Sequence, residues 1–199
     1  DDVQVRVIVA DDCSKDKTLE IIKSYEEKSP FPFVYLPAEM NMGHVRNYQR
    51  TFAACNGDYV AILEGDDYWI NPLHIKTHVD FLQSHQECVL STSHPIVLNE
   101  ESGTFLAPNI VELLSEGFKY RSLEEEIKLN VFANLSACMI RNNVLRKLDK
   151  RIYSCSILDW PMYVNLARFG PLCLMSGSSN VYRVKKNGEY AGLNKDNIE

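Results

Sequence analysis

The stretch Gly57-Asp58-Tyr59-Val60-Ala61-Ile62-Leu63-Glu64-Gly65-Asp66-Asp67-Tyr68-Trp69 is the one around which the rest of the chain is organised. Its apolar run from Val60 to Leu63 predicts a short strand that is covered on both faces. Three carboxylates, on Glu64, Asp66 and Asp67, follow at the C-terminal end of that strand. Carboxylates this close repel one another, and a cation would offset the repulsion. Because oxygen ligands suit Mg²⁺ or Mn²⁺, and ligands of open α/β sheets bind beyond the strands' carboxyl ends, the stretch indicates a metal–phosphate site.

A plainer interpretation of these residues is an acidic loop between a strand and a helix, with Asn71 capping the helix. A second acidic loop argues against it, since the predicted strand from Val3 to Ala10 ends in Asp11 and Asp12. Parallel strands bring their carboxyl ends to one edge of a sheet. We therefore expect the strands Val5 to Ala10 and Tyr59 to Leu63 to lie parallel in one sheet, with Asp12 and Asp66 at the same edge.

Length and composition indicate one globular domain. The 199 residues are 45% hydrophobic and 24% charged, which is ordinary for a chain that buries a single core. The net charge of −6 argues against nucleic acid as a partner. No apolar run is long enough for a transmembrane segment and no signal peptide is found, although peripheral contact with a membrane stays open.

The cysteines form no metal or disulfide motif that the sequence reveals. None belongs to a Cys-x-x-Cys pair, and several lie in apolar, strand-like runs. We expect free, buried thiols in a reducing compartment, without zinc and without a disulfide framework. The six are Cys13, Cys55, Cys88, Cys138, Cys155 and Cys173.

Strands and helices alternate through the first hundred residues, which predicts a parallel sheet with right-handed crossovers. The second half has a mixed pattern and is expected to extend the same sheet. It includes a predicted capping box at Ser122 and a strand from Leu135 to Arg141. Further predicted strands are Phe33–Leu36, Cys88–Ser93, Pro95–Leu98, Pro171–Met175 and Asn180–Val184, and predicted helices are Val45–Cys55, Asn142–Asp149 and Leu158–Phe169, with others after Asp16 and Asn71.

Several motifs together resemble family 2 inverting glycosyltransferases of the GT-A fold. The residues from Val7 to Thr18 are similar to the family's DDxSxDxT signature, and Asn41-Met42-Gly43 is similar to its NxG turn. Glu64-Gly65-Asp66 resembles the DxD metal motif, and Asp159-Trp160 is placed like the late acceptor-side aspartate. The closing strand is similar to Tyr182-Arg183-Val184. The resemblance covers nearly the whole chain.

This resemblance implies an α/β GT-A domain over residues 1–199, with a Rossmann-like, mostly parallel sheet and helices on both faces. Residues 1–100 would bind a nucleotide-sugar donor, and residues 101–199 would face a glycan or lipid-linked acceptor. The implied enzyme is a hexosyltransferase of polysaccharide biosynthesis, in the cytoplasm or at the inner face of the membrane.

The resemblance also implies roles for individual residues. Asp11 and Asp12 would lie near the base or ribose of the donor. Asp66 would bind Mn²⁺ or Mg²⁺ that bridges the two phosphates, with Glu64 and Asp67 beside it in the donor site. Asp159 would act as the general base on the acceptor hydroxyl, in one displacement that inverts the sugar. Trp160 could stack on a sugar ring.

The sequence departs from the family pattern in three places. The strand and helix with which the family usually opens, including a nucleotide-holding turn, are absent. The first position of the DxD motif is Glu64, which is one methylene longer than aspartate. Lys185 stands after the closing strand, where the family often has histidine, and lysine would meet a phosphate as a point charge.

Two other interpretations stay open on the sequence. A phospho-receiver domain also has a strand that ends in two aspartates, although it would need one phosphorylatable aspartate after its third strand and a late lysine. A catalytically inactive GT-A module that binds a nucleotide or a glycan is the other. The histidines at 74, 78 and 85 share one predicted helix, and we interpret them as solvated or packed side chains and not as metal ligands.

Overall fold

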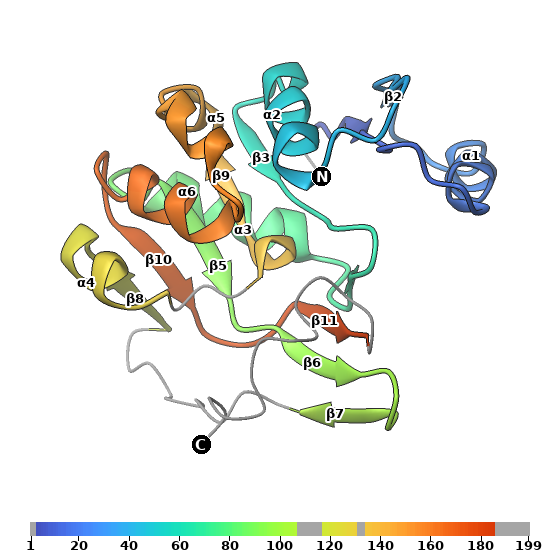
Figure 1. Ribbon diagram of the computed structural model, residues 1–199. Coiled ribbons are helices and arrows are strands. Elements are labelled where there is room, and N and C mark those ends of the chain that lie inside the picture. The colour runs from blue at the N-terminus through green and yellow to red at the C-terminus, as the bar shows by residue number, and fades with distance from the viewer. Residues whose placement is uncertain (1–2, 107–116, 131–133, 186–199) are drawn as a thin grey trace.

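The computed structural model describes residues 3–106, 117–130 and 134–185 (Figure 1). The helices are α1 (Thr18–Glu26), α2 (His44–Ala54), α3 (His74–Ser84), α4 (Leu123–Lys128), α5 (Asn142–Leu145) and α6 (Asp159–Leu166), with 3-10 turns η1 (Leu135–Ala137) and η2 (Lys150–Ser154). The strands are β1 (Val7–Val9), β2 (Phe33–Tyr35), β3 (Tyr59–Ala61), β4 (Tyr68–Trp69), β5 (Leu90–Ser93), β6 (Ile96–Asn99), β7 (Thr104–Leu106), β8 (Phe118–Arg121), β9 (Met139–Arg141), β10 (Leu172–Met175) and β11 (Asn180–Val184).

The central sheet has five strands in the order β3-β9-β5-β10-β8. β9 is antiparallel to both β3 and β5, so those two strands run in the same direction, and β10 is parallel to β5. β8 is antiparallel to β10. The sheet is therefore mixed and not mostly parallel as expected, because the second half of the chain inserts β9 and adds β8 in the reverse direction.

Alternation along the strands supplies two separate apolar faces. Val60, Ile140 and Leu172 belong to a core cluster that includes side chains of α2, α5 and α6. Their strand neighbours Met139 and Cys173 belong to a second cluster with Val79 and Leu82 of α3. Successive side chains of a strand point to opposite faces, so helices cover both faces of the sheet, as predicted.

The N-terminal unit of β1, α1 and β2 stands apart from this sheet (Figure 1). β1 is parallel to β2, and these two strands form a sheet of their own. The expectation that β1 and β3 share one sheet is therefore wrong, because no strand among the described residues connects them. No residue of α1 is buried, and its apolar Ile21 and Tyr25 are exposed.

A third sheet, in the order β4-β11-β6-β7, lies beyond the carboxyl ends of the central strands (Figure 1). β4 is the two-residue strand Tyr68–Trp69, which directly follows the acidic stretch and pairs with the start of β11. β6 and β7 form the hairpin that the Asn99–Gly103 turn predicted. This sheet therefore holds the far end of the acidic loop in place.

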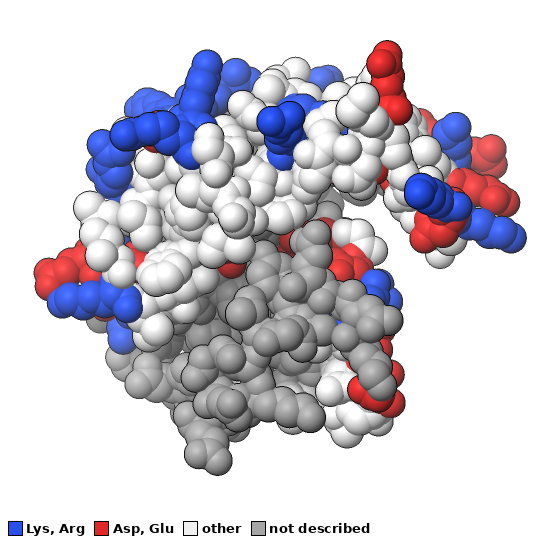
Figure 2. Space-filling view, viewed as in Figure 1, with Lys and Arg blue, Asp and Glu red and all other residues white. Residues whose placement is uncertain are grey.

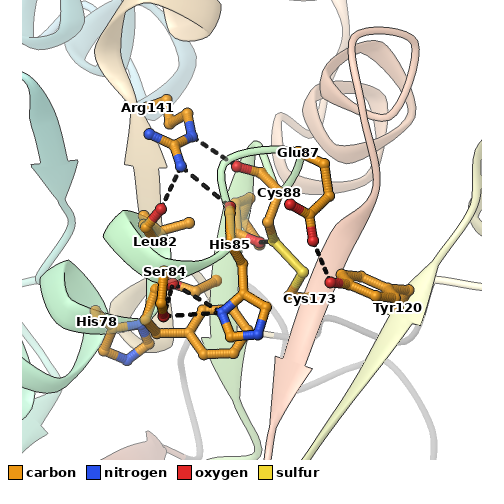
Figure 3. The surroundings of a disulfide bond; sticks show 12 residues. His78, Leu82, Ser84, His85, Glu87, Cys88, Tyr120, Arg141 and Cys173 are labelled. Carbon is orange, nitrogen blue, oxygen red and sulfur yellow. Dashed lines mark hydrogen bonds between the residues drawn. A yellow bond between two sulfur atoms is a disulfide. The ribbon is translucent and has the colours of Figure 1, made fainter.

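One disulfide overturns the expectation of free cysteines. Cys88, just before β5, is bonded to Cys173 of the neighbouring strand β10, on the face that α3 covers (Figure 3). Arg141 donates hydrogen bonds to the carbonyls of Leu82, His85 and Cys88 and so ties the end of α3 to this cross-link. The two cysteines are 85 residues apart, and closing a loop of that size is worth about 4–5 kcal/mol in the chain-entropy account.

Candidate active site

The carboxyl end of β3 carries a buried carboxyl group. The Tyr48 hydroxyl of α2 donates a hydrogen bond of 2.6 Å to Oε1 of Glu64. Burial raises the pKa of Glu64 to about 7, and the negative charges of Asp67, Asp66 and Asp159 raise it further, against the opposing effect of the Tyr48 hydrogen bond. The negative charge at this strand end is therefore not neutralised by the residues around it.

The turn η1 supports this strand end from the other side. A strand over Leu135 to Arg141 was expected, but the segment begins with this 3-10 turn and only then enters β9. The turn exposes both polar groups of Ser136: Oγ accepts a hydrogen bond of 3.0 Å from the Glu64 amide, and the carbonyl accepts one of 2.7 Å from Trp69 Nε1. Both ends of the acidic loop are thus fixed to one residue.

Asp67 and Asp66 have different surroundings. Asp67 is 8% exposed and accepts hydrogen bonds from Asn134 Nδ2 at 2.7 Å and from the Arg183 amide at 3.1 Å. Asp67 therefore anchors the loop to β11. Among the described residues, nothing donates a hydrogen bond to the Asp66 carboxylate, although the Arg183 side chain binds the Asp66 carbonyl. Asp66 is the carboxylate of this loop that is left for a ligand.

Asp159 is brought to the same site by α6. It is the first residue of that helix, and its charge raises the pKa of three buried groups around β3: Glu64, Cys138 and Tyr163. A residue 95 positions after Glu64 in the sequence is therefore its electrostatic neighbour. The adjacent Trp160 is 37% exposed and donates a hydrogen bond of 2.7 Å to the Glu126 carbonyl of α4, which positions the start of α6.

The acidic loop after β1 uses its carboxylates for backbone hydrogen bonds. Asp12 accepts bonds from the amides of Met42 at 2.9 Å and Gly43 at 2.8 Å. Gly43 has φ +84°, a backbone conformation that glycine adopts without strain, and the pair shapes the turn before α2. Asp11 accepts one bond of 3.0 Å, from the amide of Ser14.

Helix α2 connects the two acidic loops. Asn47 donates a hydrogen bond of 2.6 Å to the carbonyl of Ala10 at the end of β1, and the next residue, Tyr48, binds Glu64 after β3. The two strand ends therefore flank the same part of one helix, although they belong to different sheets. Figure 2 shows acidic side chains at the margin of the hollow between the N-terminal unit and the body, while lysines and arginines gather over α5.

Sequence reasoning missed the residues that support the site. Tyr48 looked like one member of the apolar face of a helix, and Ser136 lay inside a predicted strand. Asn134 bridges Asp67 to β11, because its Oδ1 accepts a bond of 2.7 Å from Asn180 Nδ2. A polar residue inside an apolar run was the only signal available for Ser136.

The chain matches a known family at the level of sequence. The model of glycosyl transferase family 2 matches residues 2–149. An uncharacterized protein of Mycobacterium tuberculosis is 30% identical over 189 residues, which are 92% of this chain and 51% of that protein. The chain thus spans about half the length of such curated relatives.

Solved structures share the fold. TarS of Staphylococcus aureus, in complex with UDP-GlcNAc, superimposes with a TM-score of 0.69 at 16% identity, covering 95% of this chain and 52% of that one. The mannosyltransferase PcManGT of Pyrobaculum calidifontis, in complex with GDP-Man and Mn²⁺, gives 0.67 at 14% identity, covering 94% and 50%. From the family match and these folds together, the chain belongs to glycosyl transferase family 2 and has the GT-A fold.

Proposed function

We propose that this chain transfers a sugar from a nucleotide-diphosphate donor to an acceptor hydroxyl, with inversion at the anomeric carbon. The observation that carries the proposal is the convergence of Glu64, Asp66 and Asp159, from distant parts of the sequence, at the carboxyl end of β3. The complexes of TarS with UDP-GlcNAc and of PcManGT with GDP-Man support the donor class.

A divalent metal fits the residues present. Among the described residues, no group of three or more His, Cys, Asp or Glu side chains could hold a metal ion by itself. Mg²⁺ and Mn²⁺ sites of this kind need only one or two carboxylates, since waters and substrate phosphates complete the shell. Asp66 is the protein ligand in this proposal, with Glu64 beside it. When bound, such an ion stabilises the negative charge of the departing diphosphate.

Asp159 is the general base in this proposal. Its carboxylate accepts the proton of the acceptor hydroxyl, the hydroxyl oxygen bonds to the anomeric carbon, and the bond from that carbon to the diphosphate oxygen breaks. The nucleoside diphosphate leaves with the bonding electrons. Asp11 and Asp12 lie on the nucleoside side, where Asp12 acts by shaping the turn at Gly43, and Trp160 provides an aromatic surface for the sugar or the acceptor.

The acceptor and the place of action are also proposals. We propose a glycan or lipid-linked acceptor, a hexosyl donor and a role in polysaccharide biosynthesis, in the cytoplasm or at the inner face of the membrane. In the described ranges, no helix is long and apolar enough to cross a membrane. The cysteine argument for a reducing compartment no longer supports this location, because Cys88 and Cys173 form a disulfide.

A panel of nucleoside-diphosphate sugars tests the proposal. Bound ligand raises the unfolding temperature by mass action, so the true donor should raise it in the presence of Mn²⁺ and less in EDTA. Release of the nucleoside diphosphate is then measured with the selected donor. Binding without release would favour the inactive GT-A module instead. No stabilisation by any donor would contradict the proposal, and the family match already argues against a phospho-receiver domain.

A further inference from the structure

A second cavity lies behind Trp69, on the side of α3. Its volume is about 120 Å³, and it is enclosed by the first turns of α3, the end of β5 and the loop from Met175 to Ser179. The described residues that line it include no carboxylate, lysine or arginine. Their polar groups are hydroxyls, one amide and two imidazoles. The cavity is therefore polar and carries no charge of its own at neutral pH.

Two histidines form the inner wall of this cavity. His74 and His78 are one helical turn apart on α3, are each 1% exposed, and have ring centroids 4.5 Å apart. Nδ1 of His74 lies 2.8 Å from Ser179 Oγ, and Nδ1 of His78 lies 2.8 Å from Ser91 Oγ. Burial lowers the pKa of His74 to about 4 and that of His78 to about 3, so both rings are neutral at pH 7.

One ring nitrogen of His74 is left without a partner. Its Nε2 is buried and makes no hydrogen bond to any residue that the structure describes. A buried polar atom in this state costs about 1–3 kcal/mol, so it requires an explanation. If the Ser179 hydroxyl donates to Nδ1, the neutral ring carries its hydrogen on Nε2, where it is available to a ligand.

Other donors surround the same space. Ser93 Oγ lies 3.0 Å from Ser179 Oγ, which continues the chain of hydroxyls from His74 to β5. Helix α3 begins at His74 with Leu73 as its N-cap, and no side chain caps its first turn. The amides of a first helical turn carry the positive end of the helix dipole and favour an anion.

We propose that this cavity binds a small tetrahedral oxyanion of the phosphate class, with His74 and His78 as its main side-chain donors. A hard cation finds no carboxylate ligand there, and two imidazoles are short of the four ligands of a structural zinc site. A water molecule takes about 30 Å³ of liquid, so the cavity has room for about four waters, or for an ion of five heavy atoms. The site is separate from the acidic loop and does not depend on the proposed transfer reaction.

Imidazole NMR of the whole chain tests the proposal directly. The chain has five histidines, so ¹⁵N-imidazole signals of His74 and His78 can be followed beside those of His85. Inorganic phosphate should shift the two cavity histidines saturably and leave His85 unchanged, with chloride of equal ionic strength as the blank. Glycerol phosphate distinguishes the sources: the same shift shows that the phosphate group of a larger molecule enters, and no shift restricts the site to free phosphate.

Matched variants sharpen the result. His74→Gln and His78→Gln should each weaken phosphate binding at least tenfold in calorimetry, whereas His85→Gln, on the same helix, should not. Asp66→Asn should bind phosphate as the parent does, so a failed donor site and a failed anion site are distinguishable. The proposal is overturned if phosphate leaves the signals of His74 and His78 unchanged in the parent chain, or if Zn²⁺ shifts them and phosphate does not. The NMR readout on the parent chain decides this even if a variant fails to fold.

Discussion

The two acidic loops of this chain look alike in sequence and differ in chemistry. After β1, Asp12 accepts hydrogen bonds from two backbone amides and so fixes the turn before α2. After β3, Glu64 has a pKa raised to about 7 by burial and by neighbouring carboxylates, and nothing among the described residues donates a hydrogen bond to the Asp66 carboxylate. One loop consumes its negative charge internally, and the other keeps it for a ligand.

This difference shows how a repeated motif takes on separate roles. Asp-Asp after a strand predicts a charged sheet edge, but the partners of each carboxylate decide whether it supports the structure or binds a ligand. The first loop has backbone amides within reach because the Gly43 turn folds toward it. The second has Asp159, a further negative charge, brought there by α6. Each prediction below changes a residue of one loop and leaves the other intact.

The largest expected effect is that of Asp159→Asn on the transfer rate. A general base contributes a factor of about 10²–10⁴, which corresponds to roughly 3–5 kcal/mol of barrier. Donor affinity should be almost unchanged, because this carboxylate acts on the other substrate. The measurement is a pair: donor affinity by calorimetry and transfer to a competent acceptor, with the first family strand supplied if the chain needs it for activity.

Asp149→Asn is a suitable control for this prediction, since Asp149 is an acidic residue that binds Arg151 away from the site. It should leave the rate unchanged. Transfer by Asp159→Asn at nearly the parent rate would show that Asp159 only begins α6 and that another carboxylate is the base.

A smaller effect, on folding and not on chemistry, is expected for Asp12→Ala. This variant loses two hydrogen bonds to a charged acceptor, so the free energy of unfolding should fall by about 2–3 kcal/mol. Asp11→Ala is the matched control, because Asp11 accepts one such bond and should cost less. Urea titration gives the stabilities, and hydrogen exchange at the Met42 and Gly43 amides reports the turn. Unchanged exchange at both amides would show that Asp12 does not hold the turn.

The smallest expected effect is the pH dependence that Glu64 contributes in metal-free buffer. Its pKa is raised in the folded chain, so the unfolded chain releases this proton at lower pH. The stability contribution is therefore present below about pH 4.5 and is lost as pH rises through about 7. Relative to Glu64→Gln, the parent should lose on the order of 1–2 kcal/mol between pH 5 and pH 8. Parallel stability curves for the two proteins would contradict the buried, unneutralised state of this carboxyl.

Local patterns in the sequence predicted a large part of the fold. The alternating elements of the first half, the Ser122 capping box and the hairpin turn at Asn99 were all confirmed. Each of these depends on residues that are close in the sequence. The family motifs predicted the GT-A fold because they appear in the right order along the chain.

What the sequence could not provide was pairing at a distance. The disulfide joins cysteines 85 residues apart, and nothing local distinguishes them from the four free ones. The insertion of β9 between β3 and β5 reverses a strand direction that alternation alone cannot reveal. The hydrogen bond from Tyr48 to Glu64 likewise depends on how α2 packs on the sheet.

The most direct test of the central claim is metal-dependent binding of a nucleoside diphosphate to Asp66→Asn, measured by calorimetry with Mn²⁺ and with EDTA. Asp80→Asn serves as the control, because Asp80 pairs with Lys76 on the exposed side of α3. The account predicts that the parent and Asp80→Asn bind more tightly with Mn²⁺, and that Asp66→Asn loses this gain while it keeps its fold. Binding by Asp66→Asn with an unchanged Mn²⁺ dependence would contradict the claim that the loop after β3 is the metal and donor site.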